Sequence, residues 1–298
     1  MKKDIIDIKK LNRMRCISGL VISILMVSLV FLAFTLNLIN YYKEDVPEAG
    51  IGTTRMFTTL SNILVAIASL LIIPYSIDGL RKNNYHLPRW IVDVLYIGTF
   101  CAALTFIISA TIISIAQGFY TSMINKTNLF FHLINPLFAI VLFTFVNSDH
   151  NISFKKSFIP LIPVTIYGIV YVIMAILIGE ANGGWRDVYE FNTFMPWPIT
   201  IILIAALSFG ISNLIRYLHN LKHKHFKEAV RKYYLESEDY NVPTIEDAIR
   251  ILAKKEKEDY SSGNVEIPTR IIEMLKERFN SDISTSDLSK LFINDYFE

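Results

Sequence analysis

The sequence predicts an all-α membrane protein: a polytopic bundle of six transmembrane helices followed by a small helical tail. Composition supports this, because 52% of the 298 residues are hydrophobic and only 19% are charged. Soluble domains usually carry roughly 25% charged residues. The charge is also unevenly placed, since residues 222–298 hold 13 of the 29 Lys and Arg and 16 of the 27 Asp and Glu. The rest of the chain is therefore too poor in charge for a water-soluble fold.

Six apolar runs are long enough to cross a bilayer, which needs about 20 residues per helix. They cover residues 16–42, 56–77, 90–116, 129–146, 158–178 and 197–217. Backbone groups in the bilayer core must be paired within their own segment, so each run is expected to be helical. The first run follows a basic start, as a signal peptide would, but no cleavage site of small residues follows it. We interpret it as a retained anchor.

The Lys and Arg residues outside these runs predict the orientation. One set of segments carries eleven: Lys2, Lys3, Lys9, Lys10, Arg13, Arg15, Arg81, Lys82, Arg89, Lys155 and Lys156. The alternate segments carry four: Lys43, Arg55, Lys126 and Arg186. Because positive residues accumulate on the cytoplasmic side, we predict a multi-pass protein of the cell membrane with both termini cytoplasmic.

The character of the chain changes near residue 218, which predicts a transmembrane domain (1–218) and a charged cytoplasmic tail (219–298). The first part of the tail is basic and can meet anionic lipid headgroups. Helix-starting residues then occur at Thr244, Pro268 and Ser284. Apolar residues follow them at helical spacing: Ile249, Ile251, Leu252, Ile271, Ile272, Met274, Leu275, Phe279, Leu288, Leu291, Phe292 and Phe297. The tail is expected to form a small helical domain or a set of helices that bind a cytoplasmic protein.

Two groups of polar residues lie inside the apolar runs, where polar side chains are costly and invite a functional interpretation. His132 is the only histidine within a run, four residues before Pro136. Thr58, Ser61 and Asn62 share one helix face by their spacing. The alternatives are structural: a packed histidine bonded to a neighbouring helix, and a threonine and asparagine that cap or join helices.

Depth in the membrane connects these two groups. The second and fourth runs both start from the outer side in the predicted topology, and Thr58 and His132 each lie three or four residues inside them. Both are thus roughly 5 Å below the boundary. A threonine hydroxyl becomes reactive when a base accepts its proton, and a neutral imidazole suits that role near pH 7.

The residues in these positions resemble motifs of the androgen-induced gene family. The segments concerned are Arg55-Met-Phe-Thr58-Thr-Leu-Ser-Asn62, His132-Leu-Ile-Asn-Pro136, and Pro163 with Tyr171 in the fifth run. That family, with the androgen-dependent TFPI-regulating proteins and prokaryotic six-helix relatives, includes membrane threonine hydrolases of fatty acid esters of hydroxy fatty acids. The resemblance covers about residues 15–218 and implies Thr58 as nucleophile and His132 as base.

Two features depart from the family pattern. Where relatives carry a Tyr-Pro-Tyr-Pro-Phe-like stretch, this chain has Phe194-Met-Pro196-Trp197-Pro198, and the tail has no counterpart.

Other candidate sites in the sequence are weaker. His219, His223 and His225 could bind a metal, but a basic surface helix explains them more simply, and Asp93 is expected to pair with Arg89 or Lys82. Motifs of soluble hydrolases, zinc proteases and nucleotide-binding enzymes do not occur.

The sequence thus favours an integral membrane hydrolase of lipid esters, with Thr58 and His132 as the catalytic pair and with Ser61, Asn62 or Asn135 steadying the oxyanion. Membrane lipids are its expected partners, and no cofactor, metal or nucleic acid is predicted. The alternative is a non-catalytic scaffold that acts through the tail, or a small-solute transporter. A transporter would show repeated halves and charges near the midplane, which this sequence lacks.

Overall fold

The computed structural model describes residues 8–43, 50–82, 85–147, 150–189, 191, 195–236, 245–259, 269–279, 282–288 and 291–292. The chain divides into two compact units: Asn12–Lys222, called here the first unit, and Met1–Leu11 together with His223–Glu298, called the second. All regular structure in the described residues is helical, which confirms the predicted fold class.

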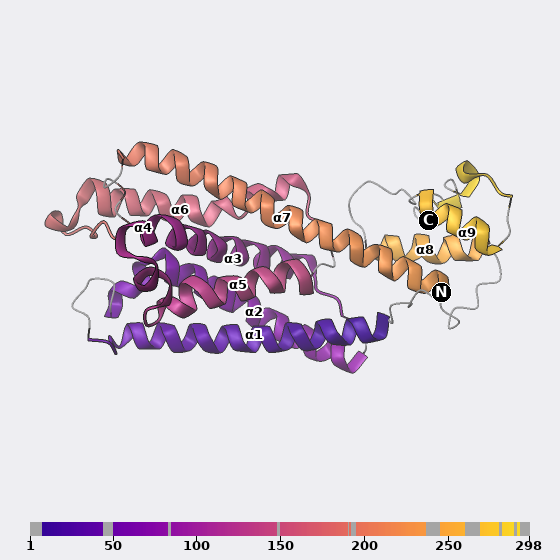
Figure 1. Ribbon diagram of the computed structural model, residues 1–298, viewed down its shortest axis with the longest axis horizontal. Coiled ribbons are helices and arrows are strands. Elements are labelled where there is room, and N and C mark those ends of the chain that lie inside the picture. Colours follow the sequence, from indigo (N-terminus) through magenta and orange to yellow (C-terminus); the bar gives the residue numbers. More distant parts are fainter. Residues whose placement is uncertain are drawn as a thin grey trace. The chain divides into compact units, whose positions relative to one another are not determined.

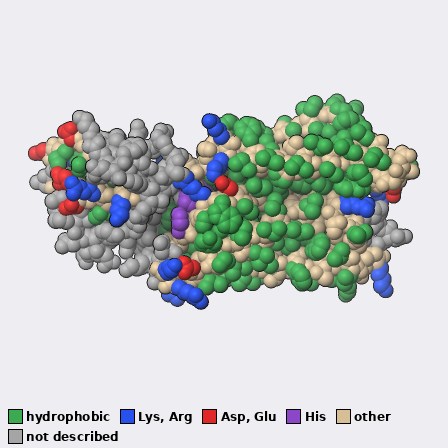
Figure 2. Space-filling model, turned by 180° about the vertical axis from the view of Figure 1, so that it is seen from behind, with side chains coloured by type: hydrophobic (Ala, Val, Ile, Leu, Met, Phe, Trp, Pro, Cys, Tyr) green, Lys and Arg blue, Asp and Glu red, His purple; other side chains and the backbone are tan. Residues whose placement is uncertain are grey.

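Within the described residues, six helices are long and apolar enough to cross a membrane: Lys10–Leu38, Phe57–Lys82, Arg89–Gln117, Leu129–Val146, Phe154–Ile178 and Trp197–Lys227. In the first unit they run side by side (Figure 1). Hydrophobic side chains cover the visible face of this unit, and Lys and Arg lie toward its ends (Figure 2). This is the surface expected of a bundle immersed in hydrocarbon.

The spans are built from the following elements. The first two are α1 (Ile8–Leu38) and α2 (Phe57–Lys82), which the short η1 (Gly50–Arg55) precedes. The third span comprises α3 (Arg89–Ile108), η2 (Ser109–Ile113) and α4 (Ser114–Gln117), and the fourth comprises η4 (Leu129–Ile134), α5 (Asn135–Val141) and η5 (Leu142–Val146), with η3 (Tyr120–Ile124) between them. The fifth comprises η6 (Phe154–Phe158), α6 (Leu161–Tyr171) and η7 (Val172–Ile178), and the sixth lies in α7 (Trp197–Glu236), with η8 (Glu180–Asn182) between them.

The third span is the centre of the bundle. In its most apolar stretch 67% of the residues are buried, against 17% in the fifth span and 22% in the sixth. Gly98 lets α2 approach closely, because a Cβ there would lie 3.2 Å from the Cα of Val65. The fifth and sixth spans are peripheral by comparison, and most of their surface is exposed.

The fourth span was predicted as one regular helix, but the structure divides it into π-helical and α-helical pieces, η4, α5 and η5. At the end of η4 the N–H of Asn135 bonds to the carbonyl of Phe130, five residues earlier. The next rung would join Pro136 to Phe131, and proline has no N–H to give. Pro136 therefore leaves the Phe131 carbonyl without its helical partner, which affects the site described below.

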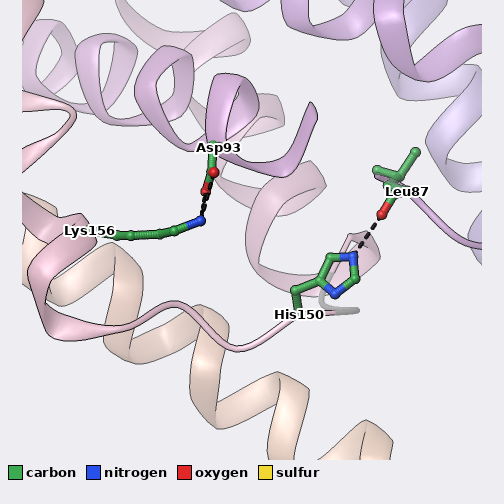
Figure 3. A network of polar contacts seen from close by, with 4 residues as sticks. All are labelled: Leu87, Asp93, His150 and Lys156. Atoms are coloured by element: carbon green, nitrogen blue, oxygen red, sulfur yellow. Dashed lines mark hydrogen bonds and ion pairs between the residues drawn. The ribbon is translucent and has the colours of Figure 1, made fainter. Parts of the chain in front are cut away.

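The end of the bundle that holds Asp93, called here the Asp93 end, is closed by polar contacts between spans (Figure 3). The Nζ of Lys156 lies 2.8 and 2.7 Å from the two carboxylate oxygens of Asp93. The predicted pairing of Asp93 with Arg89 or Lys82 is therefore wrong, because Asp93 pairs with Lys156. Lys82 pairs instead with Asp78, one helical turn away. His150 Nε2 donates to the Leu87 carbonyl at 2.7 Å. This bond joins the loop after η5 to the loop before α3.

Two basic side chains cap the last turn of the fourth span at this end. Arg15 Nε donates to the Val146 carbonyl at 2.8 Å. The ring of His219 is fully buried, with Nδ1 2.9 Å from the Phe143 carbonyl and Nε2 2.8 Å from the His150 carbonyl. A neutral imidazole supplies one of these two hydrogen bonds and an imidazolium supplies both. His219 is thus a structural residue here, and both ring nitrogens are already engaged.

The second unit has an apolar core of its own. It joins α8 (Ile245–Asp259), α9 (Thr269–Phe279) and the last described residues. Ile249, Leu252, Ile272, Leu275, Leu288 and Phe292 are buried in it, as their helical spacing predicted. Ser284 Oγ accepts the N–H of Asp287 at 3.1 Å, which is a helix cap. Thr244, Pro268 and Phe297 lie outside the described residues.

A His219→Phe variant tests the cap on the fourth span. Phenylalanine keeps the stacking on Phe143, whose ring lies 4.3 Å away, but leaves two buried carbonyls without their partner. The free energy of unfolding should fall by about 2–4 kcal/mol, measured as a lower unfolding temperature in detergent. His225→Phe is the control, because His225 is exposed and its replacement should change stability by less than about 0.5 kcal/mol. Equal effects of the two variants would contradict the cap.

Candidate functional site

Thr58 lies in the first turn of α2, at the end of the bundle opposite Asp93, called here the Thr58 end. Its side chain is mostly buried and lies close to the hydroxyl of Tyr189. Its carbonyl accepts Ser61 Oγ at 2.9 Å and Asn62 Nδ2 at 2.8 Å. Thr59 points elsewhere, with its hydroxyl 3.3 Å from that of Thr53 in η1. Neighbouring threonines thus have separate environments.

Asn62 joins α2 to the fourth span. Its Nδ2 donates to the Thr58 carbonyl and also, at 3.0 Å, to the Phe131 carbonyl that Pro136 leaves without a helical partner. Ser61 likewise joins α2 to α3, because its Oγ lies 3.0 Å from the hydroxyl of Thr105. Both residues were predicted to bind substrate. In the structure their donors hold helices together, and the substrate-binding role stays a prediction.

His132 follows Phe131 in η4, so Asn62 places it beside the first turns of α2. Its Nδ1 faces the Ser122 carbonyl. A carbonyl only accepts, so Nδ1 carries the proton and Nε2 holds the lone pair of the neutral ring. This is the tautomer that a general base needs.

The structure brings Thr58 and His132 to neighbouring helices but does not join them. Among the described residues, the hydrogen bonds of Thr58 lead to Ser61 and Asn62, and that of His132 leads to Ser122. Asn135 is fully buried at the start of α5, and its amide has no hydrogen-bond partner within the described chain. The oxyanion role of Asn135 also stays a prediction.

A cavity of about 920 Å³ opens beside Thr58, between α2, the third span, α6, η7 and α7. Most of its lining is aliphatic or aromatic, and no charged residue occurs among the described residues that form it. Its polar groups are hydroxyls, including those of Thr58, Thr105, Ser109, Tyr167, Tyr171 and Tyr189. His132, Ser61, Asn62 and Asn135 do not line it. Such a cavity suits an apolar ligand with few polar atoms.

The segment after η7 closes the cavity at the Thr58 end. Gly179 has φ 71°, and a Cβ on Gly184 would lie 2.2 Å from the Met174 carbonyl, so the tight return depends on both glycines. The Trp185 N–H then bonds to that carbonyl at 2.9 Å. This fold-back brings Tyr189 into the lining of the cavity.

Three tyrosines hold this segment against α2. Tyr171 donates to Asp187 Oδ1 at 2.7 Å and accepts the N–H of Tyr189 at 3.0 Å. Tyr189 in turn accepts the N–H of Phe57 at 2.9 Å, in the first turn of α2. Tyr167 donates to the Arg55 carbonyl at 3.0 Å. Tyr167 and Tyr171 are one helical turn apart, and this spacing in the sequence could have indicated that they share a helix face. Nothing in the sequence singles out Tyr189.

Burial raises the pKa of Tyr189, although its hydrogen bonds with Tyr167, Phe57 and Thr58 act in the opposite direction. The phenol is therefore neutral at physiological pH, and its oxygen can accept from Phe57 while its O–H donates. Tyr189 and Thr58 both line the cavity.

The described residues contain no group of three or more His, Cys, Asp or Glu side chains placed to hold a metal. No protein-family model, curated protein or solved structure matched this chain. The resemblance to the androgen-induced gene family therefore stays a prediction from short motifs, and Phe194, in one of the stretches that depart from it, lies outside the described residues.

A Tyr189→Phe variant tests the contact over Thr58. Losing the phenolic oxygen removes the acceptor of the Phe57 N–H, so amide hydrogen exchange at the start of α2 should become faster by about tenfold, the equivalent of one hydrogen bond. Exchange measured by mass spectrometry on the peptide that contains Phe57 reports this. Tyr120→Phe is the control, because Tyr120 is 66% exposed. Unchanged exchange in Tyr189→Phe would show that Tyr189 does not hold the head of α2.

Proposed function

We propose that this protein is a multi-pass cell-membrane hydrolase of lipid esters, with Thr58 as the nucleophile and His132 as the general base. The observation that supports this most is the placement of Thr58. Its side chain lines a large apolar cavity whose polar groups are hydroxyls. The tautomer of His132 and the motifs around both residues support the same proposal.

The proposed reaction proceeds in two steps. Thr58 Oγ attacks the ester carbonyl while His132 Nε2 takes the hydroxyl proton, and the proton passes to the departing alcohol. Water, deprotonated by the same imidazole, then cleaves the acyl-threonine and releases the fatty acid. Attack requires the Thr58 hydroxyl to form a hydrogen bond with His132 Nε2, which the described structure does not contain. Ser61 and Asn62 serve as positioning residues in this scheme, because their donors already hold the Thr58 carbonyl.

The catalytic pair is tested with Thr58→Ala and His132→Gln in purified protein and a fluorogenic long-chain acyl ester. Each variant should lose at least about a hundredfold of turnover. The double variant should be scarcely worse than either single one, because the two groups act as a unit. Thr59→Ala is the matched control, since Thr59 is buried but lies outside the cavity.

Full turnover in Thr58→Ala would refute the proposed nucleophile. Absence of turnover in the wild-type protein with every acyl ester tried would leave the non-catalytic alternative, in which the second unit, with its own apolar core, acts as a scaffold.

The proposed orientation places the Thr58 end outside the cell and the Asp93 end, with both termini, in the cytoplasm. An impermeant maleimide added to intact cells should label Asn182→Cys and spare Lys82→Cys, both of which are exposed positions. The native cysteines give little background, because Cys16 and Cys101 are buried. Labelling at Lys82 without labelling at Asn182 would reverse the orientation.

A further inference from the structure

We infer that the cavity binds one extended acyl chain, with its ester at Thr58 and its far end against Leu161 and Leu207, and that this floor sets the preferred chain length. The inference rests on the proposed function for the chemistry at Thr58. Binding and chain-length selection follow from the cavity itself, and are measured without turnover.

The first observation that supports this inference is the depth of the cavity. On the fifth span its lining runs from Leu161 to Ile173, along α6 and the start of η7. On the sixth span it runs from Trp197 to Ser208 of α7. At 1.5 Å per residue, the two spans give a depth of about 16–18 Å. The hydrocarbon core of a bilayer is about 30 Å thick, so the cavity is as deep as one leaflet.

The distribution of polar groups gives the chain its direction. The hydroxyls of Thr58, Tyr167, Tyr171 and Tyr189 gather at the Thr58 end, whereas of the hydroxyls in the described lining only those of Thr105 and Thr165 lie between them and the floor. The floor has Leu161, Val164 and Leu207, with the buried Ser208 beside them. A carbonyl group is therefore best placed at the tyrosines and a methyl end at the floor. No charged residue occurs among the described lining residues, so a charged group at the floor would be buried without a partner, which is costly.

The cavity also opens on the lipid-facing surface. Three of its lining residues, Ile115, Ile169 and Leu203, are 79%, 57% and 52% exposed. They belong to α4, α6 and α7 and flank the opening between the third, fifth and sixth spans. A chain already in the bilayer can pass through this opening without crossing water, whereas a water-soluble ligand would gain nothing from apolar walls of this kind.

Substitution of Gly168 tests whether the acyl chain lies in the cavity. Gly168 lines the cavity one helical turn from Tyr171, and a Cβ there would meet nothing within 4 Å. A larger side chain at this position projects into the cavity and blocks its lower part. Gly210 is the matched control, because its Cβ would also meet nothing within 4 Å, but it lies on an exposed face of α7 outside the cavity.

The experiment uses the full chain with Thr58→Ala, so that no ester is consumed, in nanodiscs of one phosphatidylcholine. Photoactivatable butyryl, palmitoyl and stearoyl glycerol esters are cross-linked, and labelling is titrated. The palmitoyl ester should bind far more tightly than the butyryl ester. Gly168→Leu should weaken palmitoyl binding by at least about tenfold, because the excluded part of the chain loses its many van der Waals contacts with the cavity walls. Butyryl binding should change little, and Gly210→Leu should alter neither.

Leu207→Ala gives the opposite change, because it deepens the floor and should shift the preference from palmitoyl toward stearoyl. This variant keeps the test decisive if Gly168→Leu fails to fold. Equal palmitoyl binding in Gly168→Leu and Gly210→Leu, or binding that is independent of chain length in every variant, would overturn the inference. Chain-length selection without turnover in the wild-type protein would refute the proposed function and leave the acyl-chain site standing.

Discussion

The amide of Asn62 is the contact on which the arrangement at the Thr58 end depends. Pro136 removes one rung from the fourth span, which would leave the Phe131 carbonyl buried without a donor, and such a group costs about 1–3 kcal/mol. Asn62 Nδ2 satisfies that carbonyl and the Thr58 carbonyl with its two N–H bonds. The Asn62 side chain therefore supplies the donor that the fourth span lacks and holds the first turn of α2 beside His132.

The cavity follows from how unevenly the six spans pack. The third span is deeply buried and close to α2 at Gly98, whereas the fifth and sixth spans bury little of their apolar surface. Space remains between them, and the glycine-dependent turn after η7 closes it with tyrosines at one end. Hydrogen bonds from Tyr171 to Asp187 and from Phe57 to Tyr189 hold that closure.

The sequence predicted the six spans and the amphipathic tail because both depend on hydropathy and helical spacing, which are local properties. It did not predict the π-helical pieces of the fourth span, since a proline shows where a rung is lost but not which neighbour replaces it. Asp93 pairs with Lys156, 63 positions away, and a search among nearby basic residues could not find that partner. Tyr189 and the cavity were missed for the same reason: side chains from distant segments create them. Thr58 was identified from its motif, yet its contact with Tyr189 required the structure.

The most direct test of this interpretation is a high-resolution structure in a nanodisc after reaction with a long-chain alkyl phosphonate that mimics an acyl ester. The phosphorus should be bonded to Thr58 Oγ, with Tyr189 displaced and the alkyl chain running along α6 toward Leu161. A phosphonate bonded to another residue, or a chain lying outside the space between the third, fifth and sixth spans, would contradict it.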